Sequence, residues 1–159
     1  MKRYARATWV AVLTLFPLTA CGGSDSPSGP AGSGTMSATV NGSGWSVDSG
    51  QAQYNVSEDL IVLFAPSTGS YGMGVNLPAF AGPGTYAFEN QRFATVTLGA
   101  DPGWGTTYED GEGSLTVTSF SSERITGTFQ FTAYPSPSSS QTGTLVVTDG
   151  QFDLPVIPL

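Results

Sequence analysis

The sequence predicts an all-β protein, folded as a single-domain antiparallel β-sandwich or flattened barrel of about ten short strands. Three observations lead to this prediction. From Met36 onward, apolar and polar residues alternate with a period of two, which is the repeat of a half-buried strand. Turn residues interrupt the alternation at short intervals, because the chain contains 21 Gly and 11 Pro. Helical periodicity is absent from this region of the sequence.

The first predicted strands are short runs separated by polar or glycine-containing turns. Alternation predicts strands at Ser37–Val40, Trp45–Val47 and Ala52–Val56. Leu60–Ala65, with the sequence LIVLFA, is a continuous apolar run of strand length, as expected for a central strand. Asn41-Gly42 favours the positive φ values of a tight hairpin between the first two strands.

The middle and the C-terminal part continue the same pattern. The clearest strand is Arg124–Tyr134 (RITGTFQFTAY), in which Phe129 and Phe131 share one face and threonines occupy the other. Asp149-Gly150 predicts a second tight hairpin, after which Phe152 and Leu154 should join the same core. The other predicted strands are Tyr71–Leu77, Thr85–Phe88, Ala94–Leu98, Ser114–Phe120, Gly143–Thr148 and Gln151–Val156.

The N-terminal segment has the layout of a secretory signal peptide at residues 1–20. A positively charged start precedes an apolar run over Ala7–Leu18, which is shorter than the roughly 20 residues that a membrane-spanning helix needs. Leu18-Thr19-Ala20-Cys21 resembles the lipobox of bacterial lipoproteins, in which the Cys thiol accepts a diacylglycerol. Cys21 is the only cysteine of the chain, as expected when one thiol is needed for lipidation and none for disulfides.

The predicted organisation follows from this anchor. Residues 21–35 are rich in Gly, Ser and Pro and are expected to form a tether, and residues 36–159 the all-β domain. We expect a cell-envelope protein, anchored to a membrane through Cys21. The anchor would lie in the outer membrane if the organism has one, since the resemblance to lipoproteins implies that Gly22 disfavours retention in the inner membrane.

Composition excludes several classes of function. Two arginines and 12 acidic residues remain after the signal peptide, so the mature net charge is −10 and nucleic-acid binding is disfavoured. The mature chain contains no His, no Lys and no Cys besides Cys21. Triads and dyads based on His, Cys or Lys are therefore impossible, as are zinc or copper sites built from imidazole and thiolate. We expect no cofactor and no enzymatic activity.

Four segments, in this order, resemble a family of uncharacterised bacterial lipoprotein β-domains. They are ATVNGSGW, GPGTY, RITGTFQFTAY and VVTDGQFDLPV, beginning at Ala38, Gly82, Arg124 and Val146. The resemblance implies an all-β fold and a lipid-anchored location. It implies no catalytic residues, because the family has no established activity.

The acidic stretch DPGWGTTYEDGEG, residues 101–113, is the most conspicuous local feature and is expected to be a loop. Trp104 and Tyr108 could form an aromatic platform for a sugar ring, or Trp104 could fold back over the open end of the sandwich. On the first reading, Trp104→Ala should destabilise the protein far less than Phe129→Ala. The leading hypothesis is a non-enzymatic domain that binds a glycan or an envelope protein.

Carboxylates are the remaining candidates for metal binding or catalysis. A weak calcium candidate in the same stretch consists of Asp101, Glu109, Asp110 and Glu112, but their spacing does not match an EF-hand loop. The alternative function is a carboxylate-dependent hydrolase such as a glycosidase, for which the last three residues and Glu89 are the possible acids. The competing interpretation of the stretch is a solvated turn between strands.

Overall fold

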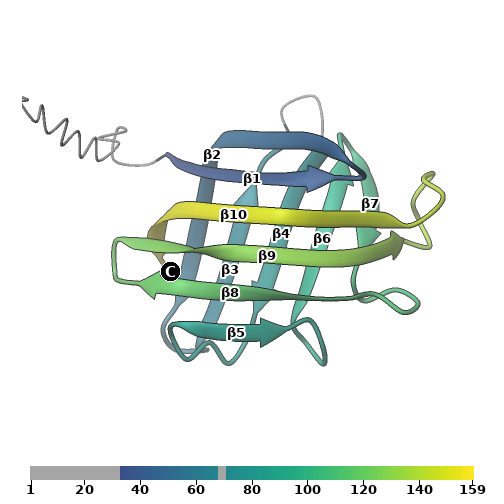
Figure 1. Ribbon diagram of the computed structural model, residues 1–159. Coiled ribbons are helices and arrows are strands. Elements are labelled where there is room, and N and C mark those ends of the chain that lie inside the picture. The colour runs from purple at the N-terminus through teal and green to yellow at the C-terminus, as the bar shows by residue number, and fades with distance from the viewer. Residues whose placement is uncertain (1–32, 68–70) are drawn as a thin grey trace, which may run out of the picture.

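A computed structural model describes residues 33–67 and 71–159 and confirms the all-β, single-domain prediction. These residues form ten strands and no helix (Figure 1). Within this part of the chain, no helix is long and apolar enough to cross a membrane. The strands are β1 (Gly34–Val40), β2 (Ser43–Asn55), β3 (Leu60–Ala65), β4 (Tyr71–Leu77), β5 (Gly84–Ala87), β6 (Phe93–Leu98), β7 (Asp101–Gly105), β8 (Glu112–Phe120), β9 (Arg124–Pro135) and β10 (Leu145–Pro158).

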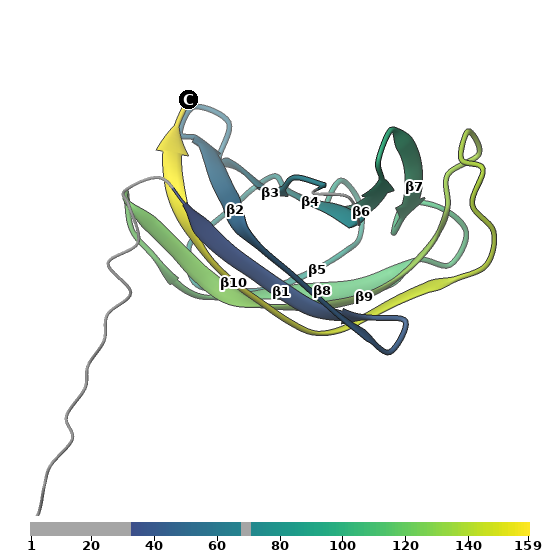
Figure 2. The ribbon, with the colours of Figure 1, turned by 90° about the horizontal axis from the view of Figure 1, so that it is seen from above.

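The strands form two layers that cross one another and are joined at their corners into a ring. Layer A contains β1, β10, β9, β8 and β5, together with the first half of β2. Layer B contains the second half of β2 and β3, β4, β6 and β7. Figures 1 and 2 show the strands of layer A running across those of layer B, the arrangement of an orthogonally packed sandwich.

Two long strands change layers and so close the ring. The first half of β2 pairs with β1 and its second half, Gln51–Asn55, pairs with β3. At the opposite corner, Tyr134 and Pro135 at the end of β9 pair with β7. The end of β10 lies parallel to β2, which is the one parallel pairing among the described strands. The result is the flattened barrel that the sequence predicts, with β5 at a free edge.

The core fills the space between the layers. Phe129 and Phe131 are each 3% exposed and their rings stack with centroids 6.2 Å apart, so the prediction that they share a core face is confirmed. Phe152 and Leu154 are buried on β10, which pairs with β9 as expected. Layer B contributes a comparable apolar face, which includes Ile61, Leu63, Met73, Val75, Leu77, Ala94 and Val96.

In two places the sequence predicts the end of a strand at polar residues that in fact lie inside a continuous strand. The sequence divides β2 at Asp48–Gln51 and β10 at Asp149-Gly150, whereas each strand is continuous through these polar residues. Asp149 has a φ of 54° within a bulge of β10, where the register to β9 shifts between Val147 and Gly150. A bulge and a hairpin both accept positive φ, so the dipeptide alone cannot distinguish them. Asn41-Gly42, by contrast, does join β1 to β2 with φ of 46° and 80°.

Candidate functional site

The predicted lipid site and signal peptide lie outside the described residues. This applies to residues 1–20, to Cys21 and to the tether up to residue 32. The described chain enters the fold at Gly34, the first residue of β1, so Gly34 and Thr35 of the expected tether are part of this strand. Both pair with neighbouring strands, Gly34 with Gly50 and Thr35 with Asp153.

The structure buries Trp104, which favours the interpretation that this residue folds back onto the sandwich over that of an exposed aromatic platform, and it corrects the expectation that residues 101–105 form a loop. Asp101–Gly105 form β7, and Trp104 is only 6% exposed. Its ring makes an edge contact with Tyr71 at a centroid distance of 6.0 Å, and its Nε1–H donates to the Gly143 carbonyl at 2.9 Å. Tyr108 follows in a turn, half-buried beside Gly105. The face of Trp104 is therefore not available for stacking on a sugar.

The four acidic residues of the weak calcium candidate are not brought together. Among residues 33–67 and 71–159, no three acidic, His or Cys side chains are close enough to hold a metal ion. Asp101 instead accepts hydrogen bonds from the Ser139 hydroxyl at 2.5 Å and the Gly103 amide at 2.8 Å, and it also accepts from Ser140. Glu109 and Asp110 are exposed in the turn after β7, and Glu112 is the first residue of β8.

Asp101 acts as a clamp on the loop between β9 and β10. The Ser139 hydroxyl, followed by that of Ser140 and the Gly103 amide, holds the pKa of the Asp101 carboxyl well below its usual range, because all of them stabilise the ionised form. The clamped loop also supplies the Gly143 carbonyl that binds Trp104. The carboxylate of Asp101 therefore has a structural role in the fold.

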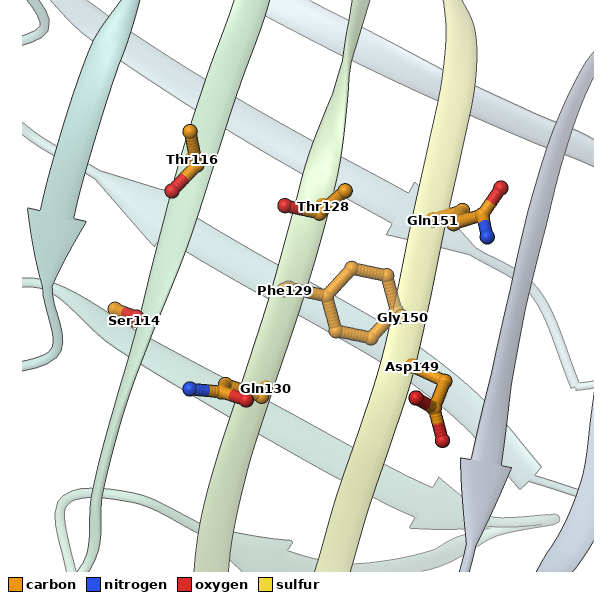
Figure 3. A pocket seen from close by; sticks show the side chains of 8 residues that line it. All are labelled: Ser114, Thr116, Thr128, Phe129, Gln130, Asp149, Gly150 and Gln151. Atoms are coloured by element: carbon orange, nitrogen blue, oxygen red, sulfur yellow. The ribbon is translucent and has the colours of Figure 1, made fainter.

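The outer face of layer A is polar and carries several shallow hollows, two of which lie over β8, β9 and β10. A row of hydroxyl and amide side chains crosses six strands in register: Thr85, Thr116, Thr128, Gln151, Ser37 and Ser46. The hollow in Figure 3, of about 340 Å³, lies over Gly150 between β8, β9 and β10. The second, of about 420 Å³, lies beside Gly113 and shares Gln130 with the first.

Core packing accounts for both of these hollows. A Cβ at Gly150 would lie 2.4 Å from the Phe129 carbonyl and 2.5 Å from its ring, which Figure 3 shows beneath the strand. A Cβ at Gly113 would lie 2.4 Å from the Gln130 carbonyl and from Phe131 Cβ. Glycine is therefore required at both positions so that β8, β9 and β10 can approach over the core. The hollows need no ligand to explain them.

The outer face of layer B carries a hollow of a different kind. It has a volume of about 340 Å³ and lies over the middle of β3, β4 and β6. In the ladder, Gly74 lies between Phe64 and Thr95, and Asn76 lies between Val62 and Phe93. Phe64 is 48% exposed and is the only exposed aromatic side chain of the described residues.

Packing does not require the glycine at the floor of this hollow. A Cβ at Gly74 would meet only the Thr95 hydroxyl at 3.0 Å and the Leu63 carbonyl at 3.9 Å, and its φ is not in the left-handed region. Rotation of the Thr95 side chain would relieve the first contact. Glycine within a strand costs about 0.5–1 kcal/mol of stability relative to alanine. The domain is therefore less stable with Gly74 than it would be with alanine, and the hollow is open because Gly74 has no side chain.

The hollow over Gly74 has no charged lining. Its eight lining residues are Val62, Leu63, Phe64, Gly74, Val75, Asn76, Phe93 and Thr95. Arg92 is adjacent in sequence, but its guanidinium lies 5.4 Å from the Tyr86 ring centroid and its Nε–H donates to the Pro78 carbonyl. An exposed aromatic ring, apolar walls and uncharged hydrogen-bonding groups are suited to a neutral ligand with both apolar and polar parts.

Comparison with known proteins identifies a family but no activity. A family described as Domain of unknown function (DUF6252) matches residues 32–154. The chain belongs to this family. No curated protein and no solved structure matches the chain. The DUF6252 match covers all the strands except the last residues of β10, and thus includes the hollow over Gly74.

Sequence reasoning did not find this site in the DUF6252 domain, although a signal was present. In LIVLFA, alternation directs Ile61 and Leu63 inward and therefore directs Phe64 outward. In YGMGVNL, Gly74 lies at an outward position between the buried Met73 and Val75. An outward aromatic residue and an outward mid-strand glycine indicate a surface hollow only once the pairing of β3 with β4 is known.

Proposed function

We propose that this chain is a lipid-anchored envelope protein whose β-domain is a non-enzymatic module that binds a neutral glycan over Gly74. The observation that carries the proposal is Phe64, an aromatic ring left 48% exposed beside an uncharged hollow. A pyranose ring has an apolar C–H face, which an aromatic ring can cover, and hydroxyl groups that bind amides and hydroxyls. Asn76 and Thr95 supply those polar groups in the lining of the same hollow.

The distribution of carboxylates favours binding over hydrolysis. A retaining glycosidase needs two carboxyl groups about 5 Å apart. The hollow over Gly74 has no carboxylate in its lining, and the two hollows over β8, β9 and β10 have one each, Asp149 and Glu112. Both of these acids are exposed to solvent.

The location rests on the N-terminal sequence. Leu18–Cys21 and the preceding apolar run support lipidation of Cys21, and acyl chains hold stably when two or more insert into a bilayer. Metabolic labelling with palmitate tests this directly. Label should enter the wild-type protein and be absent from Cys21→Ala, and equal labelling of the two would show that the anchor is assigned wrongly.

The binding function is tested with the full chain, purified in a zwitterionic detergent that lacks a sugar headgroup. Screening on an array of neutral and charged glycans should show binding to neutral ones, and Phe64→Ala should abolish it. Val146→Ala is the matched control, because Val146 is a similarly exposed apolar residue (43%) on layer A. Failure to bind any neutral glycan, or equal loss in both variants, would contradict the proposal.

A further inference from the structure

We infer that the glycan bound over Gly74 carries an N-acetyl group, so that the ligand is a 2-acetamido sugar. This inference rests on the proposed function and specifies its ligand. Three outward apolar side chains, Phe64, Val62 and Phe93, contribute to the lining of the hollow. A hexose offers hydroxyl groups around its whole edge, whereas an acetamido group offers a methyl and an amide together.

The positions of the lining residues follow from the pairing of three strands. Phe64, Gly74 and Thr95 form one row across β3, β4 and β6, and Val62, Asn76 and Phe93 form the next. Of these six outward positions only Gly74, at the centre of the first row, has no side chain, and this leaves a gap in the surface. Neighbouring strands are about 4.8 Å apart, so this gap admits a group the size of a methyl.

Polar groups lie beside the gap where an amide would need them. Thr95 Oγ1 is 3.0 Å from the position that a Gly74 Cβ would occupy, so it borders the gap directly. Asn76 is two residues along the same strand, and its Nδ2 is 3.5 Å from the Gln91 carbonyl, at the limit of a hydrogen bond. Asn76 can thus donate to an acetamido carbonyl, and the Thr95 hydroxyl can accept from its N–H.

Charge argues against the charged modifications of sugars, which are carboxylate, sulfate, phosphate and protonated amino groups. The mature chain has a net charge of −10, and the hollow contains no cation to bind a carboxylate, sulfate or phosphate. It contains no carboxylate to bind a protonated amino sugar either. An uncharged substituent with an apolar end and an amide is the modification that these residues can satisfy fully.

The experiment compares three tetrasaccharides by isothermal titration calorimetry with the full chain in the same detergent. The probes are chitotetraose, which is N-acetylated, its de-N-acetylated counterpart and cellotetraose. Burial of one methyl and formation of one amide hydrogen bond should make chitotetraose bind at least about tenfold more tightly than the others. Equal affinity for chitotetraose and cellotetraose would overturn the inference while leaving the proposed function intact.

Two variants test whether the gap itself is responsible. Gly74→Ala should weaken chitotetraose binding about tenfold or more and change cellotetraose binding little, with a melting temperature that is unchanged or slightly raised. Val146→Ala should bind chitotetraose like wild type. Chitotetraose binding that is unaffected by Gly74→Ala would overturn the inference. If none of the three sugars binds, the inference also fails, and the glycan array decides separately whether the proposed function fails with it.

Discussion

Replacement of Trp104 by alanine tests the assignment of β7 to the core. The ring is 6% exposed and its N–H binds the Gly143 carbonyl, so the variant loses both apolar burial and a hydrogen bond. Truncation of a buried aromatic residue to alanine costs about 3–5 kcal/mol, and the hydrogen bond adds about 1 kcal/mol. Phe129→Ala, at 3% exposure, should cost about 3–5 kcal/mol as well. The two variants should therefore be similarly destabilised.

The measurement is urea unfolding of the fragment 33–159, followed by far-UV circular dichroism because Trp104 itself contributes to the fluorescence. With a slope of about 1–3 kcal/mol per molar urea, each alanine variant should lower the midpoint by roughly 2 M. A domain with about 5–15 kcal/mol of stability would be left marginal by such a loss. Trp104→Phe is the control: it keeps a ring and loses the N–H, and should cost about 1–2 kcal/mol.

The outcome that refutes the reasoning is specific. If Trp104→Ala stays within about 1 kcal/mol of wild type while Phe129→Ala loses 3 kcal/mol or more, the ring does not belong to the core. The stretch from Asp101 to Gly113 would then be the exposed loop that its composition suggests, and Trp104 would again be a candidate for stacking on a sugar.

Three further predictions follow from the clamp and the glycines. Asp101→Asn should loosen the loop over Trp104 and shift its emission to longer wavelength, as measured by fluorescence at pH 7. Because the pKa of Asp101 is lowered on folding, its contribution to stability is full above about pH 4 and is lost as the pH falls below that value. The urea midpoints measured at pH 7 and at pH 3 should therefore differ less for Asp101→Asn than for the wild type. Gly150→Ala should lower stability by about 1–3 kcal/mol through its contact with Phe129, whereas Gly74→Ala should leave the urea midpoint unchanged or slightly raise it.

The fold could be predicted from the sequence where a strand has one buried and one exposed face. The bounds predicted for Tyr71–Leu77 coincide with β4, because buried and outward residues alternate along most of it. Those predicted for Leu60–Ala65 coincide with β3, because a continuous apolar run of strand length ends at turn residues on both sides. Phe129 and Phe131 were placed on the core face of β9 because of alternation. Local pattern is sufficient when the side chains themselves decide which face is buried.

The prediction fails where the backbone, not the side chains, makes the close contact. β7 has the sequence DPGWG, which shows turn residues and no alternation. Gly103 lies at a bulge of this strand, with a φ of 60°, where the register to β6 shifts between Val96 and Leu98, and a Cβ there would lie 2.0 Å from the Val96 carbonyl. Such a contact depends on the pairing of β6 with β7, which a local window of sequence does not contain.

The candidate site was missed because glycines serve two purposes that look the same in sequence. Gly150 and Gly74 both lie within strands, but Gly150 is buried between the exposed Asp149 and Gln151, whereas Gly74 faces outward between the buried Met73 and Val75. At Gly150, a Cβ would collide with the backbone and ring of Phe129, so the core excludes any larger residue. At Gly74, the space is on the solvent side, and a methyl group would need only a rotation of Thr95. A glycine that the core does not need lies across the ladder from the one exposed aromatic ring of the described chain, and the proposal of a binding site rests on this pair.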